Sequence, residues 1–163
     1  MYEVTRRFHC SKRRSNSLPI TRMKMKHRLS FGYFTLLADN IVEVTIDDGV
    51  ELSLEMVEEC DGFFKAHIFG DFGMLINRIN EYTYSYEAQL SIGSYEGLKA
   101  IAFVYYSDKS KSLVEKINLT RAYDNWNSSL FSGLELEWQQ ALQWLKNELL
   151  ICDEQAVSNL IQG

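Results

Sequence analysis

Long apolar runs and paired cysteines are what this sequence most clearly lacks. Its longest apolar run reads AIAFVYY, far below the roughly 20 residues with which a helix crosses a bilayer. Cys10, Cys60 and Cys152 are far apart and form no CxxC pair, which argues against a disulfide framework and a cysteine zinc site. We therefore expect a cytoplasmic protein without a transmembrane segment.

The motifs that usually mark enzyme sites are also missing. No Walker loop, GxGxxG, HExxH, GxSxG or EF-hand pattern occurs. His67 is the one histidine after residue 30, so no histidine metal site is expected. Asp47 and Asp48 are adjacent in a turn, where their side chains diverge, which leaves a two-carboxylate mechanism unsupported. We expect no enzymatic activity, no catalytic residue, no cofactor and no metal.

Composition indicates one globular unit with an uneven charge. With 163 residues and 46% hydrophobic content, the chain is long enough for one core and too short for two ordinary domains. Residues 1–30 carry nine Lys and Arg against one acid, whereas the other 133 residues carry eight basic and 21 acidic residues. The acidic body argues against nucleic-acid binding by the folded domain, because the phosphates would be repelled.

The same features divide the chain into three parts. Residues 1–29 form a basic leader without an apolar stripe, which we expect to be disordered on its own. Either translation starts at Met23 or Met25, or the leader is a functional arm or a targeting peptide. Residues 30–151 form the domain, and residues 152–163 form a tail that we expect to be frayed.

The first half of the domain predicts a hairpin followed by a helix. Two strands, 31–37 and 41–47, flank Asp39 and Asn40, which tolerate the left-handed backbone of a tight turn. Ser53 is then placed to cap a helix by accepting a hydrogen bond from a free backbone amide. Its expected core-facing residues, at helical spacing, are Leu54, Val57, Cys60 and Phe64.

The middle of the chain predicts two neighbouring parallel strands. The run at 98–106 is apolar on both faces, which is typical of a covered, parallel strand, and its partner is 73–79. Parallel neighbours need a crossover, for which residues 83–92 supply a short helix capped by Ser85 or Thr83. The residues expected to point inward from this segment are Tyr84, Ala88 and Ile92.

The last third continues the alternation of helix and strand. A helix capped by Ser107, Asp108 or Ser110 runs to about residue 119. A short strand then covers 127–131, and an amphipathic helix runs from Leu134 to Leu149. An initial hairpin followed by alternating helices and strands predicts an α/β fold. We expect a mixed sheet of about five strands packed with about four helices.

A family resemblance follows from this order of elements. The chain runs from ADNIVEVTIDDGVELSLEMVEECDGFF through MLINRINEYTYSYEAQ and LKAIAFVYYSDKSKSLVEKI to LEWQQALQWLKNEL. Over roughly residues 30 to 150 it resembles the SpoIIAA-like members of the STAS superfamily, small bacterial single-domain proteins that are in part labelled STAS/SEC14-like. The resemblance implies a STAS-like fold and a regulatory role through protein interaction.

The phosphorylation motif of that superfamily is not matched. Its best-understood members carry Asp-Ser-Ser-Gly at the start of the helix after the third strand, and phosphorylation there blocks docking of a partner. The corresponding residues here are Ser85, Tyr86, Glu87 and Ala88. We interpret Ser85 as a structural cap.

A candidate interaction or ligand surface lies where the parallel strands end, because open sheets bind ligands beyond the carboxyl ends of their strands. Arg78, at the end of the third strand, is expected to be solvent-facing or ion-paired. The residues assigned to this surface are Asn77, Arg78, Tyr82, Tyr84, Ser85, Ser107 and Asp108.

Three functions are therefore open. The first is a non-enzymatic interaction or regulatory module with an unknown protein partner. A homodimer is also possible, because partly exposed tryptophans often anchor interfaces. The alternative is a SEC14-like carrier of a small apolar ligand or lipid, which needs an internal cavity. An unrecognised enzyme is the third.

Overall fold

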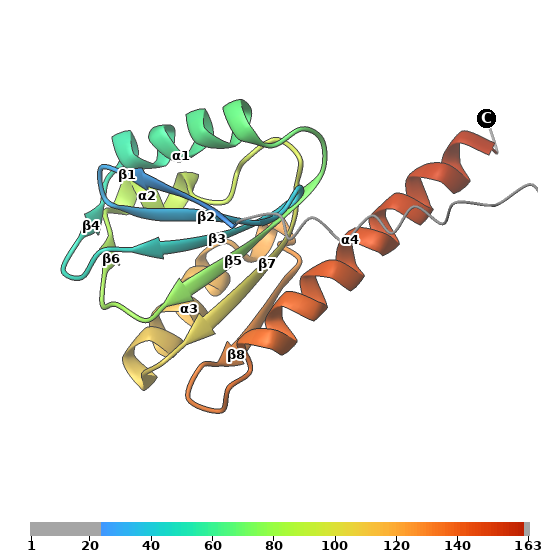
Figure 1. Cartoon of the computed structure of the whole chain (residues 1–163). Helices are drawn as coiled ribbons and strands as arrows, with labels where there is room; N and C mark the ends of the chain where they lie inside the picture. Colours follow the sequence, from blue (N-terminus) through green and yellow to red (C-terminus); the bar gives the residue numbers. More distant parts are fainter. Residues whose placement is uncertain (1–23, 162–163) are drawn as a thin grey trace, which may run out of the picture.

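The computed structural model describes residues 24–161 (Figure 1). Its main sheet has six strands: β1 (Met25–Leu29), β2 (Gly32–Ala38), β3 (Ile41–Ile46), β5 (Phe72–Arg78), β7 (Leu98–Tyr105) and β8 (Ser128–Ser132). Two short strands pair beside it: β4 (Glu51–Leu52) and β6 (Thr83–Tyr84). The helices are α1 (Leu54–His67), α2 (Tyr86–Ser91), α3 (Asp108–Thr120) and α4 (Trp138–Ile161), with a 3-10 turn η1 (Ala122–Asp124).

The main sheet is mixed, as predicted. Its strand order is β1-β2-β3-β5-β7-β8, with antiparallel pairing from β1 to β3 and parallel pairing from β3 to β8. Asp39 and Asn40 form the turn between β2 and β3, and β5 and β7 are parallel neighbours joined through α2. The α/β class and the five predicted strands are confirmed, and β1 adds a sixth strand to the sheet.

Serine caps fix the starts of three helices. The hydroxyl oxygens of Ser53, Ser85 and Ser107 accept hydrogen bonds from the amides of Met56, Ala88 and Ser110, at 3.4, 3.1 and 3.1 Å. Each bond satisfies one of the amides that a first helical turn leaves unpaired. The cap at Ser53 was predicted outright, whereas Ser85 was one of two candidates and Ser107 one of three.

The tyrosine-rich segment is part strand and part helix. Thr83 and Tyr84 pair with Glu51 and Leu52 as β6, so the predicted helix over 83–92 is too long at its start. The helix begins at Tyr86 because Ser85 caps it, while the two preceding residues keep the extended backbone that their alternation indicates.

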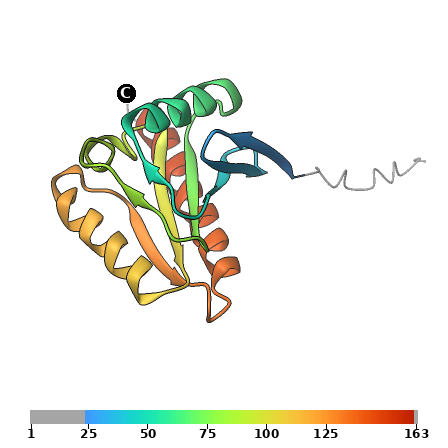
Figure 2. The same cartoon turned by 90° about the vertical axis from the view of Figure 1, so that its left-hand side faces the viewer.

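Helices cover both faces of the sheet. One face packs against α1, α2 and α3 through a large cluster that includes Phe34, Met74 and Ile101. The other packs against α4, where Leu75 and Ala102 meet Leu145. Figure 2 shows α4 in red on the far side of the strands from α3. Adjacent residues of β5 thus enter opposite cores, which explains why the central strands are apolar on both faces.

The folded part begins earlier than predicted. Residues 25–29, assigned to the leader, form the edge strand β1 on β2, whereas residues 1–23 lie outside the described residues. Arg28 clamps the strand by two hydrogen bonds to the Asp47 carboxylate, at 2.9 and 2.6 Å, and lowers the pKa of that group. Leu29 is buried. The prediction missed β1 because its anchoring partners lie outside the segment.

Both ends of the last helix differ from the prediction. It begins at Trp138, since Leu134 lies in the preceding turn and is 73% exposed. It continues to Ile161, so the segment 152–161 is helical where we expected a frayed tail. Once the first turns are docked, each further residue adds a hydrogen bond without a new nucleation cost. No helix within residues 24–161 has the length and apolar character that crossing a membrane requires.

Removal of β1 should destabilise the domain. A chain beginning at Ser30 loses the burial of Leu29 and the Arg28–Asp47 clamp, and uncovers the edge of β2. We expect the free energy of unfolding to fall by about 2 kcal/mol or more, measured by urea denaturation against a chain beginning at Lys24. Equal stability of the two chains would contradict this role of β1.

Candidate functional site

The structure divides the predicted surface residues between the two faces of the sheet. Asn77 points toward α4, where its side-chain amide donates to the Glu43 carboxylate at 2.9 Å. The same carboxylate oxygen accepts from Nε1 of Trp138 at 2.8 Å. Arg78 points to the opposite face, because consecutive residues of a strand alternate. The seven residues therefore do not form one surface.

Arg78 is buried at the carboxyl end of β5, where we expected a solvent-facing or ion-paired side chain. It is 1% exposed. Its guanidinium donates to the carbonyl oxygen of Tyr82 at 2.9 Å, to the hydroxyl of Tyr84 at 3.3 Å and to Oγ of Ser110 at 3.5 Å. The Tyr82 ring also lies 3.8 Å from the guanidinium carbon. The arginine thus joins β5, β6 and the first turn of α3.

This buried cation forms no ion pair with a described carboxylate. Three of its five N–H groups have partners, two of them at long distances. Charge burial is costly unless the charge is paired or well hydrogen-bonded. At Arg78, contacts with a carbonyl oxygen and with aromatic rings therefore offset the cost of burying the charge.

Tyr82 and Tyr84 form an aromatic pair beside Arg78. Their rings meet edge to face with centroids 5.6 Å apart, and their hydroxyl oxygens are 3.5 Å apart. Burial raises the pKa of Tyr82 well above its ordinary value, although Arg78 acts in the opposite direction. The Tyr82 hydroxyl therefore stays protonated at physiological pH.

The three remaining predicted residues have separate roles. Ser85 caps α2 and is not part of the arginine cluster. Ser107 caps α3 and also donates to Oε1 of Glu81 at 2.7 Å. Asp108 is exposed in the first turn of α3, where an acidic side chain interacts favourably with the helix dipole.

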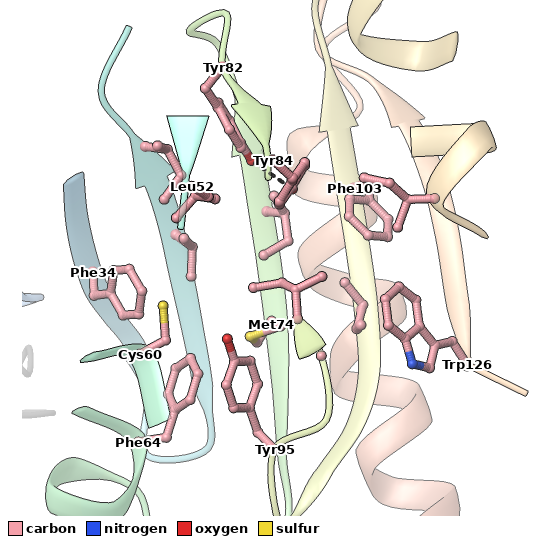
Figure 3. Close-up of a pocket in the computed structure, with 17 residues that line it drawn as sticks. Phe34, Leu52, Cys60, Phe64, Met74, Tyr82, Tyr84, Tyr95, Phe103 and Trp126 are labelled. Atoms are coloured by element: carbon pink, nitrogen blue, oxygen red, sulfur yellow. Dashed lines mark hydrogen bonds between the residues drawn. The ribbon is translucent and has the colours of Figure 1, made fainter. Parts of the chain in front are cut away.

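A small cavity lies between the sheet and the helices on the Arg78 face. Its volume is about 30 Å³, and apolar side chains form most of its wall, including those of Phe34, Met74 and Phe103 (Figure 3). Tyr82 and Tyr84 close one end, while Tyr95 and Trp126 line other parts of the wall. A volume of this size holds one or two water molecules.

Two polar groups in the cavity wall stay uncharged. Burial raises the pKa of the Cys60 thiol to about 12, so Cys60 is a buried apolar side chain, as predicted. Burial also raises the pKa of Tyr95, and the nearby Cys60 thiol adds to the effect. The Tyr95 residue is 7% exposed, and its hydroxyl lies beside the Cys60 thiol but makes no hydrogen bond of normal geometry within residues 24–161.

Arg121 is a second buried arginine that the sequence interpretation missed. Its guanidinium donates to the carbonyls of Gln89 and Ile92 at 3.1 and 2.7 Å, and it pairs with Asp124. The carbonyls belong to the end of α2, which has no basic residue of its own there. Arg121 therefore ties α2 to the end of α3, and its charge is paired with a carboxylate, whereas that of Arg78 is met by neutral groups.

The two described histidines lie together, which was also missed. His27 was assigned to the leader, but β1 places its ring 4.5 Å from that of His67 on α1. Phe63 stacks on His67 with ring centroids 4.4 Å apart. Within residues 24–161, no group of three or more His, Cys, Asp and Glu side chains could hold a metal ion.

Comparisons with known proteins leave the family open. No family model matches the chain, and no curated protein or solved structure matches it either.

Charge reversal at Arg78 should destabilise the fold. Arg78→Glu buries an unpaired carboxylate beside the carbonyl oxygen of Tyr82, and we expect it to cost about 3–5 kcal/mol. Arg78→Met keeps the packing and leaves the Tyr82 carbonyl without its donor, which should cost about 1–2 kcal/mol. Urea denaturation of both variants checks the order, and equal losses would show that the buried charge is not the decisive feature.

Removal of the Tyr95 hydroxyl should leave the protein as stable or make it more stable. Tyr95→Phe keeps the ring and deletes a buried group without a hydrogen-bond partner. We expect the free energy of unfolding to change by between zero and about +1 kcal/mol. A loss of stability in thermal or urea unfolding would indicate that the hydroxyl is bonded in solution, for example by a trapped water molecule.

Proposed function

We propose that the chain is a non-enzymatic interaction or regulatory module of SpoIIAA-like fold that works in the cytoplasm. The order of its elements supports this assignment, because a hairpin leads into alternating helices and strands over the range of the resemblance. Ser85 serves as a helix cap, so the proposed module does not depend on a phosphate at that serine.

The observation that carries the proposal is the projecting half of α4, residues 150–161. Leu149 is the last residue of this helix that is buried against the sheet. Beyond it the helix extends away from the body of the domain (Figure 1). The apolar side chains Leu150, Val157 and Ile161 are 60%, 56% and 78% exposed. Exposed apolar side chains grouped in this way mark interaction sites.

These side chains form one stripe along the helix. Their spacing of seven and four residues places them within about 40 degrees of one another. The stripe is separate from the face that carries Leu145 and Leu149 against the sheet. The projecting half of α4 therefore offers a second apolar face, with the geometry by which one amphipathic helix packs on another.

Charges near the stripe indicate the chemistry of the partner. Asp153 and Glu154 are exposed on the projecting half, and no Lys or Arg occurs between residues 147 and 161. A second copy packed on this surface would bring like charges together. The partner that fits best is a different protein with an apolar helix flanked by Lys or Arg, because opposite charges favour the encounter.

A charge within the stripe should abolish partner binding. Val157→Glu places a carboxylate among the apolar side chains, whereas Gln155→Glu adds the same charge on another side of the same helix as a matched control. We expect the partner to co-purify from the host with wild type and with Gln155→Glu, and at least about ten-fold less with Val157→Glu. Native mass spectrometry measures the amounts.

Hydrogen exchange provides the second readout. The amides of residues 153–161 should be protected more strongly in the complex than in the isolated protein. Equal co-purification by all three forms would refute this interface, and a homodimer lost in Val157→Glu would replace the basic partner with a second copy.

A further inference from the structure

Trp126 separates the buried cavity from a pocket on the surface. The inner cavity has a volume of about 30 Å³, and the outer pocket has about 340 Å³. Gly93, Ile101 and Trp126 line both spaces. The outer pocket is the more polar of the two, since Lys99 and Asn127 belong to its wall. The indole ring is therefore a partition between an apolar interior and a polar entrance.

The Trp126 ring sits in a place that a glycine leaves free. A Cβ atom on Gly93 would lie 2.7 Å from the ring, and its backbone φ of +78° suits glycine. The guanidinium carbon of Arg121 lies 4.6 Å from the ring centroid. The ring is held by packing and a cation–π contact, and it is partly exposed at the end of a loop just before β8.

The Tyr95 hydroxyl points into the inner cavity. Figure 3 shows it directed from the ring toward the space beside Met74. A phenylalanine would fill the same space without leaving a buried polar group unpaired, and such a group costs stability. The hydroxyl is thus available to donate a hydrogen bond to a molecule that occupies the cavity.

Size and polarity restrict what that molecule is. The inner cavity has room for one or two water molecules, so a larger ligand has to displace a wall. Movement of Trp126 frees about the space of one aromatic ring, which suits a compact aromatic molecule. The walls contributed by Phe34, Phe64 and Phe103 exclude an ion, because desolvation of its charge would not be compensated.

We propose that the inner cavity and the outer pocket form one binding site for a small neutral aromatic molecule with a hydrogen-bond acceptor. Tyr95 is the donor that orients the ligand, and Trp126 is the gate through which it enters. The inner cavity is on the sheet face opposite α4, and the site does not include the projecting half of that helix, so it does not depend on the proposed protein interface.

Two matched probes test the site by fluorine NMR. Para-fluoroacetophenone carries a carbonyl acceptor, and para-fluoroethylbenzene has a similar shape without one. For wild type we expect a Kd on the order of 1 mM for the ketone, and about five-fold weaker binding of the hydrocarbon, which corresponds to one hydrogen bond. Tyr95→Phe should remove this preference and leave the affinity for the hydrocarbon unchanged.

Variants of two tryptophans test the gate. Trp126→Ala should bind both probes about ten-fold more tightly, because no ring has to be displaced first. Trp144→Ala is the control, since Trp144 packs against Phe131 on the α4 face and should leave both affinities unchanged. Trp126→Leu replaces the alanine variant if circular dichroism shows that the latter is unfolded.

Each contrary result has a definite meaning. Failure of wild type and both Trp126 variants to bind either probe overturns the site. A preference for the ketone that persists in Tyr95→Phe overturns the donor. If the Trp126 variants bind and wild type does not, the proposed gate role of Trp126 is refuted, because the ring then blocks the cavity without moving. Val157→Glu should bind the probes as wild type does, so that failure of the protein interface and failure of this site are distinguishable.

Discussion

Apolar side chains on both faces of β5 and β7 have to be shielded from water, and the rest of the structure depends on this constraint. Met74 and Leu75 are adjacent in β5 yet enter separate cores. One helix, α4, covers one face, while three shorter helices and the β4–β6 pair share the other. The burial of apolar area on both faces is the main source of stability in such a sheet.

The two faces differ in how completely they are filled. A long helix packs on its side as a single piece, with Ala141, Leu145 and Leu149 buried in a row. On the other face several short elements meet, and the buried polar side chains Arg78, Arg121 and Tyr95 lie where these elements contact one another. Arg121 is satisfied by carbonyls and a carboxylate, whereas the partners of Arg78 within the described part of the chain are all neutral. The small cavity lies between these same elements.

The long helix also connects fold and proposed function. Its first half is fixed by the sheet, so that the hydrogen-bonded ladder extends without further support through residue 161. The docked half therefore presents the second half as a preformed helix. A partner that packs on it does not have to compensate for ordering of the backbone, which favours binding through a modest apolar stripe.

The sequence by itself determined the elements whose signals are local. The caps at Ser53, Ser85 and Ser107 and the turn at Asp39 and Asn40 each depend on residues within a few positions of one another. The parallel pairing of β5 and β7 followed as well, because an uninterrupted apolar strand is typical of a covered parallel sheet. Parallel neighbours in turn need a crossover, which the residues between these two strands supply.

Only the tertiary structure decided what depends on distant contacts. β1 is held by Arg28 and Asp47, which are 19 positions apart in the sequence. Arg78 is enclosed with the help of Ser110 on α3, which is 32 positions away in the sequence. His27 meets His67, and Gly93 receives Trp126, by the same kind of long-range packing. Periodicity reports which side of an element is apolar. It does not report which polar side chain the neighbouring elements will enclose, because that depends on how all the elements pack together.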